Sequence, residues 1–188
     1  ASSSAASDVY KRQGLLDKEP NPAHTALVAL EAWLEEQGRA FLLITQNVDC
    51  LHDAAGSRSM VKIHGTADRV RCAAVGCDNG APKGSLPMSD VDFSAFEQDP
   101  DAENLPRCPL CGSFVRPHVL WFDEYYTGHR DYEIDRALRA LKKARTLLFV
   151  GTSFSVGITD MALQTGLQRG AKIHSVDPVS APPHRKMQ

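Results

Sequence analysis

The chain has 188 residues, of which 43% are apolar and 23% charged, so it can bury a core and is not expected to be disordered as a whole. Its 21 basic and 23 acidic residues give a net charge of −2, which argues against a general binder of nucleic-acid phosphates, a class that is usually basic. No apolar run approaches the ~18 residues of a membrane span, and the N-terminal residues lack the layout of a signal peptide. We therefore expect a cytoplasmic protein that binds neither nucleic acid nor membranes, and the sequence leaves its oligomeric state open.

The chain begins with a polar, Ser- and Ala-rich stretch, residues 1–13, which we expect to be a disordered or non-native tail. A helix follows, because Asn21 suits its N-cap, Pro22 its first position and Gly38 its end. The helical spacing of three leucines predicts one apolar face, flanked by an alanine and a tryptophan. These residues are Leu27, Leu30 and Leu34, with Ala26 and Trp33 beside them.

Short apolar segments alternate with helical ones in the rest of the chain. Phe41–Thr45 is predicted to be a strand buried on both sides. After an irregular middle region, Tyr132–Ala144 is predicted to be a helix, Thr146–Val150 a strand, about Thr159–Gln168 a helix and Lys172–Val176 a strand. Strands that alternate with helices predict the α/β class, with a parallel sheet and right-handed crossovers.

Four of the five cysteines form two close pairs in the irregular region. Cys72 and Cys77 are separated by four residues, and Cys108 and Cys111 by two. Two such pairs can place four thiolates around one tetrahedral zinc ion, which would order a segment that is otherwise too polar to fold. With every position filled by sulfur, the ion would be structural. The alternative is four unrelated reduced thiols.

Polar residues follow three of the predicted strands, where ligands bind in open α/β sheets. Their amides, hydroxyls and carboxylates suit phosphate and ribose oxygens. Each group also has a structural interpretation, as a helix cap, an ordinary turn or a turn residue before Pro178. The candidates are Gln46, Asn47 and Asp49 after the first strand, Gly151, Thr152 and Ser153 after the second, and Asp177 after the third.

His64, between Ile63 and Gly65, titrates near neutrality and can take a proton from a sugar hydroxyl, although a lone histidine is more often structural. Cys50 stands apart from the other cysteines and is interpreted as a plain buried thiol, because nothing near it in the sequence lowers its pKa.

Taken in order, these motifs resemble the sirtuins, the NAD-dependent protein-lysine deacylases, from about residue 14 to 178. The Arg-Pro-His-Val-x-Trp-Phe form is most similar to the bacterial and mitochondrial desuccinylase-like branch. The matching motifs are Thr45–Asp49, Leu51-His52, His64-Gly65, the two cysteine pairs, Arg116–Glu124 and Gly151–Ser153.

The resemblance implies an incomplete Rossmann-like parallel sheet with helices on both faces, built from residues 14–68 and 116–188, and a zinc module at 69–115. NAD and an acyl-lysine protein or peptide would enter between them. The implied roles are as follows: His64 as general base; Gln46, Asn47 and Asp49 at the nicotinamide and its ribose; Gly151, Thr152, Ser153 and Asp177 at the nucleotide; and Val119, Trp121, Phe122 and Glu124 along the peptide, which would pair as an added strand.

The sequence also departs from the family pattern. The Gly-rich phosphate loop expected before residue 14 is missing, and the chain stops at Gln188 where relatives continue, so we expect a fragment that holds zinc but binds NAD poorly. Asp123 replaces the usual glycine and would favour basic substrates. The alternatives are an NAD-dependent protein ADP-ribosyltransferase, which would use the same site, and a zinc-ribbon interaction module without catalysis.

Overall fold

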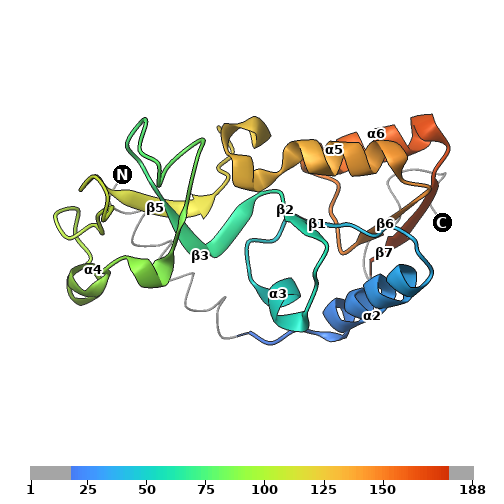
Figure 1. Ribbon diagram of the computed structural model, residues 1–188, viewed down its shortest axis with the longest axis horizontal. Coiled ribbons are helices and arrows are strands. Elements are labelled where there is room, and N and C mark those ends of the chain that lie inside the picture. Colours follow the sequence, from blue (N-terminus) through green and yellow to red (C-terminus); the bar gives the residue numbers. More distant parts are fainter. Residues whose placement is uncertain (1–17, 178–188) are drawn as a thin grey trace. The chain divides into compact units, whose positions relative to one another are not determined.

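The computed structural model describes residues 18–177, which fall into two compact units (Figure 1). The first unit runs to Ile134 and the second begins at Asp135. The predicted tail, residues 1–13, lies outside the described residues. None of the helices within 18–177 is long and apolar enough to cross a bilayer.

Helix α2, Pro22–Glu36, starts where the sequence predicts because Asn21 caps it. The Asn21 Oδ1 accepts hydrogen bonds from the backbone amides of Ala23 at 2.9 Å and His24 at 3.3 Å. In return, the backbone amide of Asn21 donates to Nδ1 of His24 at 3.2 Å. This reciprocal capping box satisfies amides that would otherwise lack partners at the first turn.

The predicted apolar face of α2 is only half-buried, and its two predicted flanking residues are exposed. The buried residues of this helix are instead His24 and Glu31. The Glu31 carboxylate accepts hydrogen bonds from the backbone amides of Arg58 at 3.1 Å and Ser59 at 2.6 Å. Hydrophobic periodicity predicts burial of apolar residues only. It missed this face because Glu31 is polar and is buried by its hydrogen bonds to residues of a distant loop.

A small parallel sheet forms the next layer of the first unit. Strand β1, Leu43–Thr45, pairs with β2, Met60–Lys62, and helix α3, Leu51–Ala55, lies between them along the chain. The prediction placed the start of β1 two residues early and expected burial on both sides, whereas Thr45 is its one buried residue. The sequence analysis did not identify α3 or β2, which have five and three residues.

The irregular region contains an antiparallel sheet. Its strand order is β4-β3-β5, with β3 at Gly65–Cys72, β4 at Leu86–Pro87 and β5 at Val115–Val119. Strands β3 and β5 cross the predicted limits of the zinc module at 69 and 115, and the division into domains predicted from the sequence stays a prediction. Short helices complete this region: η1 (Met88–Asp90), α4 (Ser94–Gln98), η2 (Tyr126–Gly128) and η3 (Arg130–Tyr132).

The second unit contains the parallel β-α-β arrangement that the sequence predicts. Strands β6, Thr146–Val150, and β7, Lys172–Val176, pair in parallel over all five residues, with helix α6, Gly157–Arg169, between them along the chain. Helix α5 spans Ile134–Lys143 and begins two residues later than predicted, because η3 precedes it.

Helix α6 packs closely on β6 at Gly166. A Cβ atom at this position would lie 2.5 Å from Cδ1 of Leu147, so a larger residue requires the Leu147 side chain to move. Leu163 of α6 and Ile173 of β7 form a small buried apolar cluster, and Phe149 of β6 packs against it. The residues of β6 alternate between exposed and half-buried.

Candidate functional site

His64 lies in the two-residue turn between β2 and β3, and backbone contacts position its side chain. The amide of Ile63 donates to the Thr45 carbonyl at 3.1 Å, so the chain after β2 stays beside the end of β1. The His64 Nδ1 lies 3.0 Å from the carbonyl oxygen of Gln46. Because a carbonyl oxygen can only accept, Nδ1 carries the proton and Nε2 carries the lone pair. The predicted strand-end residue and the predicted base are thus brought together.

The environment of His64 keeps its ring neutral. Burial lowers the pKa of His64 below its ordinary value of 6.5, and the hydrogen bond to the Gln46 carbonyl opposes this shift. A neutral imidazole with an oriented lone pair is the form that a general base needs at neutral pH.

Tyr126 is the residue of this site that the sequence analysis missed. Its ring lies nearly parallel to that of His64, at 14° and with centroids 5.8 Å apart, and its hydroxyl is 3.4 Å from Nε2. Tyr126 is 62 residues away along the chain, on η2, so no local pattern connects it with His64.

Some polar groups of the turn after β1 form hydrogen bonds within the turn itself. The backbone amide of Asn47 donates to Oγ1 of Thr45 at 3.1 Å, and the Asp49 carboxylate accepts from the backbone amide of Leu51 at 3.0 Å, at the start of α3. Asp49 therefore satisfies a backbone amide at a helix start, which is the helix-cap role given as the structural alternative for this group. The Asn47 side chain is exposed, and Gln46 and Asp49 are half-buried.

At Gly65, the residue after His64, the backbone approaches strand β5 closely. Its φ is +79°, and a Cβ atom at this position would lie 2.1 Å from the backbone oxygen of His118. Gly65 pairs with Val119 in the antiparallel register, and the Leu120 amide donates to the His64 carbonyl at 2.9 Å. The predicted peptide-binding segment therefore starts beside the predicted base.

Both carboxylate oxygens of Glu124 have partners within the chain. Its Oε1 accepts from Arg71 at 2.5 Å and from Arg116 at 2.6 Å, and its Oε2 accepts from Arg116 at 3.1 Å and from the Trp121 amide at 3.0 Å. Arg71 is buried, so Glu124 neutralises an interior charge. This arrangement gives Glu124 a structural position, and its role toward a peptide stays a prediction.

The remaining peptide-segment candidates differ in exposure. Val119 ends β5 and is half-buried, and its carbonyl accepts from Arg116 at 2.9 Å. The Arg116 guanidinium carbon lies over the Trp121 ring, 3.7 Å from the centroid of that ring. Trp121 is 44% exposed, whereas Phe122 is fully exposed. The stretch from Trp121 to Glu124 forms a turn, closed by a hydrogen bond between the Glu124 amide and the Trp121 carbonyl at 3.0 Å.

In the second unit, the predicted nucleotide residues meet at one end of the strand pair. Val150 and Val176 are partners in the parallel register, so the residues that follow them emerge at the same edge. The Gly151 amide donates to the Val176 carbonyl at 2.9 Å and is not available to a phosphate, contrary to expectation, while Ser153 Oγ lies 2.6 Å from the hydroxyl of Ser155. The residues gathered here are Gly151, Thr152, Ser153 and Asp177.

The four paired cysteines meet, as the sequence predicts. Their sulfur atoms all lie within 4.8 Å of one another, with 3.4 Å between Cys72 and Cys111 and 3.9 Å between Cys77 and Cys108. Zinc–thiolate bonds of ~2.3 Å in a tetrahedron separate the sulfurs by ~3.8 Å, so the cluster fits one zinc ion. Cys50 lies outside the cluster, half-buried against Thr66, and burial raises the pKa of its thiol.

Comparisons with known proteins agree with this geometry. The chain is 39% identical over 153 residues to the dog protein named NAD-dependent protein deacylase sirtuin-5, mitochondrial, covering 77% of this chain and 48% of the relative. It is 36% identical over 173 residues to an NAD-dependent protein deacylase of Thermus thermophilus, covering 92% of this chain and 60% of the relative. The chain thus spans between about half and three fifths of the length of these curated relatives.

Solved structures show the same fold. A Sir2 homologue in complex with ADP-ribose has a TM-score of 0.73 at 32% identity, covering 96% of this chain and 64% of that one. A Sir2 homologue in complex with NAD has a TM-score of 0.66 at 36% identity, covering 88% and 56%. The predicted Rossmann-like α/β class is confirmed. The family pattern described as Sir2 family matches residues 4–157, more than three quarters of the sequence, and this chain therefore belongs to the Sir2 family.

Proposed function

We propose that this chain carries the catalytic residues of an NAD-dependent protein-lysine deacylase, which transfers an acyl group from lysine and yields nicotinamide and O-acyl-ADP-ribose. The observation that carries the proposal is the state of His64. Its Nδ1 proton is held by the Gln46 carbonyl at 3.0 Å, and its Nε2 lone pair is directed away from that carbonyl. The Sir2 family match and relatives named NAD-dependent protein deacylases support it.

The residues of the chain would divide the work as follows. When bound, NAD supplies an electrophilic ribose carbon and a leaving nicotinamide. Nε2 of His64 takes a proton from a ribose hydroxyl and thereby makes that oxygen nucleophilic. Gln46, Asn47 and Asp49 would orient the nicotinamide and its ribose, and the carboxylate of Asp49 favours positive charge on the sugar. The nucleotide would be held by Gly151, Thr152, Ser153 and Asp177.

The substrate would be an acyl-lysine protein or peptide. A Sir2 structure bound to acetylated peptide has a TM-score of 0.69 at 27% identity to this chain, covering 90% of this chain and 63% of that one. Trp121 and Phe122 present apolar surface beside β5, which suits the side chains of an extended peptide. We assign no nucleic-acid or membrane partner, since Lys142 and Lys143 are simply explained as cations at the C-terminal turn of α5.

One structural zinc ion would be held by Cys72, Cys77, Cys108 and Cys111. Four soft thiolate donors select zinc and leave no position for a reacting water, so the ion would stabilise the predicted module at 69–115 without taking part in the chemistry. Thiolate ligands and the free thiol of Cys50 suit a reducing compartment, and we place the protein in the cytoplasm. Cell fractionation would test this location, and recovery in mitochondria would contradict it.

The direct test uses the complete gene product that carries this chain, incubated with NAD and a panel of acyl-lysine peptides. We expect free lysine and nicotinamide in equal amounts, and at least about a 100-fold loss of turnover in His64→Ala, the lower end of the range for loss of a general base. His174→Gln, which alters a half-buried histidine on β7, is the control and should retain activity. Label transferred from NAD onto protein, without lysine release, would instead identify an ADP-ribosyltransferase.

A further inference from the structure

The loop between β6 and α6 contains a residue with a strained backbone. Phe154 has a φ of +56°, in the left-handed region that residues with a side chain rarely adopt. Within residues 18–177, Glu133 is the one other non-glycine residue with positive φ. Phenylalanine also lacks the short polar side chain with which asparagine or aspartate stabilises this conformation. Such strain persists only where surrounding contacts impose it.

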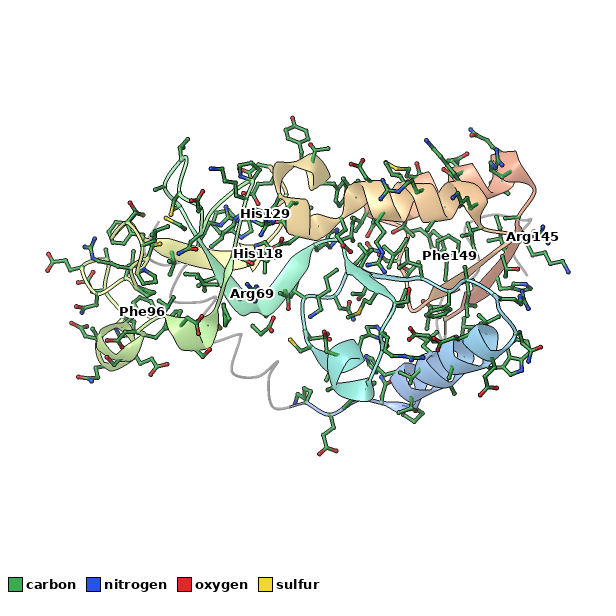
Figure 2. The ribbon with its side chains drawn as sticks, viewed as in Figure 1. Arg69, Phe96, His118, His129, Arg145 and Phe149 are labelled. Atoms are coloured by element: carbon green, nitrogen blue, oxygen red, sulfur yellow. The ribbon has the colours of Figure 1, made fainter. Side chains whose placement is uncertain are left out.

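The ring of Phe154 makes contacts of this kind. Its centroid lies 4.9 Å from that of Phe149, and the two rings are tilted by 51° to each other. Phe149, which is labelled in Figure 2, lies on β6. Both phenylalanines pack against the buried pair formed by Leu163 of α6 and Ile173 of β7. The ring therefore attaches the loop to the apolar cluster of the second unit, and moving it would expose apolar surface to water.

The hydrogen bonds around Phe154 are weaker restraints. The hydroxyls of Ser153 and Ser155, on either side of it, are 2.6 Å apart and exposed, so water competes with this bond. Val156 is the N-cap of α6 and makes no side-chain hydrogen bond there. The ring contacts of Phe154 are therefore the stronger restraint on its backbone.

The conformation of Phe154 determines the path of the loop. The chain is fixed before the loop, where the Gly151 amide donates to the Val176 carbonyl at 2.9 Å, and after it by α6. Thr152 and Ser153 lie between these fixed points and directly precede Phe154. A change to negative φ at Phe154 would redirect the backbone here and displace both residues, because backbone dihedrals set the direction of the chain.

We propose that Phe154 is a positioning residue of the nucleotide site. Its ring, packed on Phe149, holds the backbone in the left-handed conformation that places Thr152 and Ser153 toward the nucleotide, and Phe154 itself does not touch the ligand. The inference rests on the proposed function for the identity of that ligand, NAD. Strained backbone of this kind is found at ligand sites because it holds binding groups in place before the ligand arrives.

The test compares three substitutions of Phe154 in the complete gene product, with NAD binding measured by calorimetry. Phe154→Ala removes the ring but keeps Cβ, so the loop should relax to negative φ. The Kd for NAD should then rise about tenfold, the population ratio that the penalty of the left-handed region implies. Phe154→Gly also removes the ring, but glycine adopts positive φ readily, so its Kd should rise less. Phe154→Leu keeps an apolar side chain for the cluster and should bind NAD nearly as the unsubstituted protein does.

This order of affinities separates positioning from packing. If only lost apolar contacts mattered, glycine would be no better than alanine at this position. Leu167→Ala is the matched control, because Leu167 packs against the same cluster from α6 and is also truncated to Cβ. We expect it to lower the unfolding temperature and to leave the Kd for NAD unchanged.

The inference would be overturned by unchanged NAD affinity in Phe154→Ala, or by a larger loss in Phe154→Gly than in Phe154→Ala. If the unsubstituted protein bound no NAD, the proposed function would fail together with this inference. NMR of the unsubstituted protein covers the case in which the variants do not fold. A strong nuclear Overhauser effect between the amide and Hα protons of Phe154 is expected for positive φ, with further effects between its ring and that of Phe149. A weak intraresidue effect would also overturn the inference.

Discussion

The hydroxyl of Tyr126 lies 3.4 Å from Nε2 of His64, on the nitrogen that carries the lone pair. The two rings are nearly parallel, so Tyr126 both covers the imidazole and is placed to donate a hydrogen bond to its neutral form. A donor to the neutral form opposes protonation and acts in the same direction as burial.

The first prediction concerns the pH dependence of deacylation. Burial lowers the pKa of His64 from 6.5, so the base is neutral at pH 7. The value of kcat/KM should therefore fall only as the pH drops below 6.5. Tyr126→Phe removes the donor and should move the acid limb of the kcat/KM profile to higher pH, toward 6.5. Profiles of the complete gene product measure both effects, and an acid limb above pH 6.5 before substitution would contradict the assignment.

Glu124→Gln is expected to destabilise the protein by about 3 kcal/mol, the lower end of the range for breaking a buried ion pair, because it leaves the buried Arg71 without a counter-charge. Burial by itself raises the pKa of Glu124, but hydrogen bonds from Arg116 and the Trp121 amide outweigh it and hold the pKa below 4.5. The pair should therefore stabilise the fold above pH 4.5, and this contribution should vanish as the pH falls through the lowered pKa. Urea unfolding at several pH values measures this, with the exposed Asp123→Asn as a control of unchanged stability.

Gly65→Ala and Gly76→Ala form a matched pair. Both glycines have positive φ, +79° and +84°, but only Gly65 would place a Cβ atom against backbone, 2.1 Å from the His118 oxygen, while Gly76 faces open space. Gly76→Ala should cost about 1 kcal/mol for its backbone conformation alone. Gly65→Ala should cost about 3 kcal/mol or more, because β3 and β5 have to separate. Equal losses of unfolding free energy for the two variants, measured by thermal or urea unfolding, would contradict a stabilising role for the close approach of β3 and β5 at Gly65.

Loss of one cysteine ligand should release the zinc ion and destabilise the sheet of β3, β4 and β5. Cys111→Ser changes an exposed member of the four-sulfur cluster, so altered packing contributes little to the effect. We expect zinc content to fall about tenfold or more and the unfolding temperature to drop, since a zinc ion bound by the four cysteines would contribute directly to folding. Cys50→Ser, outside the cluster, should retain both values. A Cys111→Ser protein with full zinc content would contradict the four-cysteine assignment.

Features determined by neighbouring residues could be predicted from the sequence. The start of α2 follows from Asn21 and Pro22, and the bounds of β6 and β7 follow from short apolar runs that end in turns. The cysteine spacing predicted each close pair for the same reason, because a few residues of chain join its members, whereas the fold brings the two pairs together across 31 and 39 residues. Local chemistry is sufficient for the helix start, the strand bounds and each cysteine pair.

Contacts between distant residues were decided only by the tertiary structure. Glu31 is buried because it accepts hydrogen bonds from amides 27 and 28 residues away, and Tyr126 reaches His64 across 62 residues. Polarity and periodicity predict neither contact, because both depend on which backbone amides and rings the fold brings near. The sequence by itself determined the N-cap of α2, the parallel β-α-β unit and the two close cysteine pairs. The tertiary structure decided which polar groups are buried and which face one another, since burial and hydrogen bonding are properties of the packed chain and not of any segment.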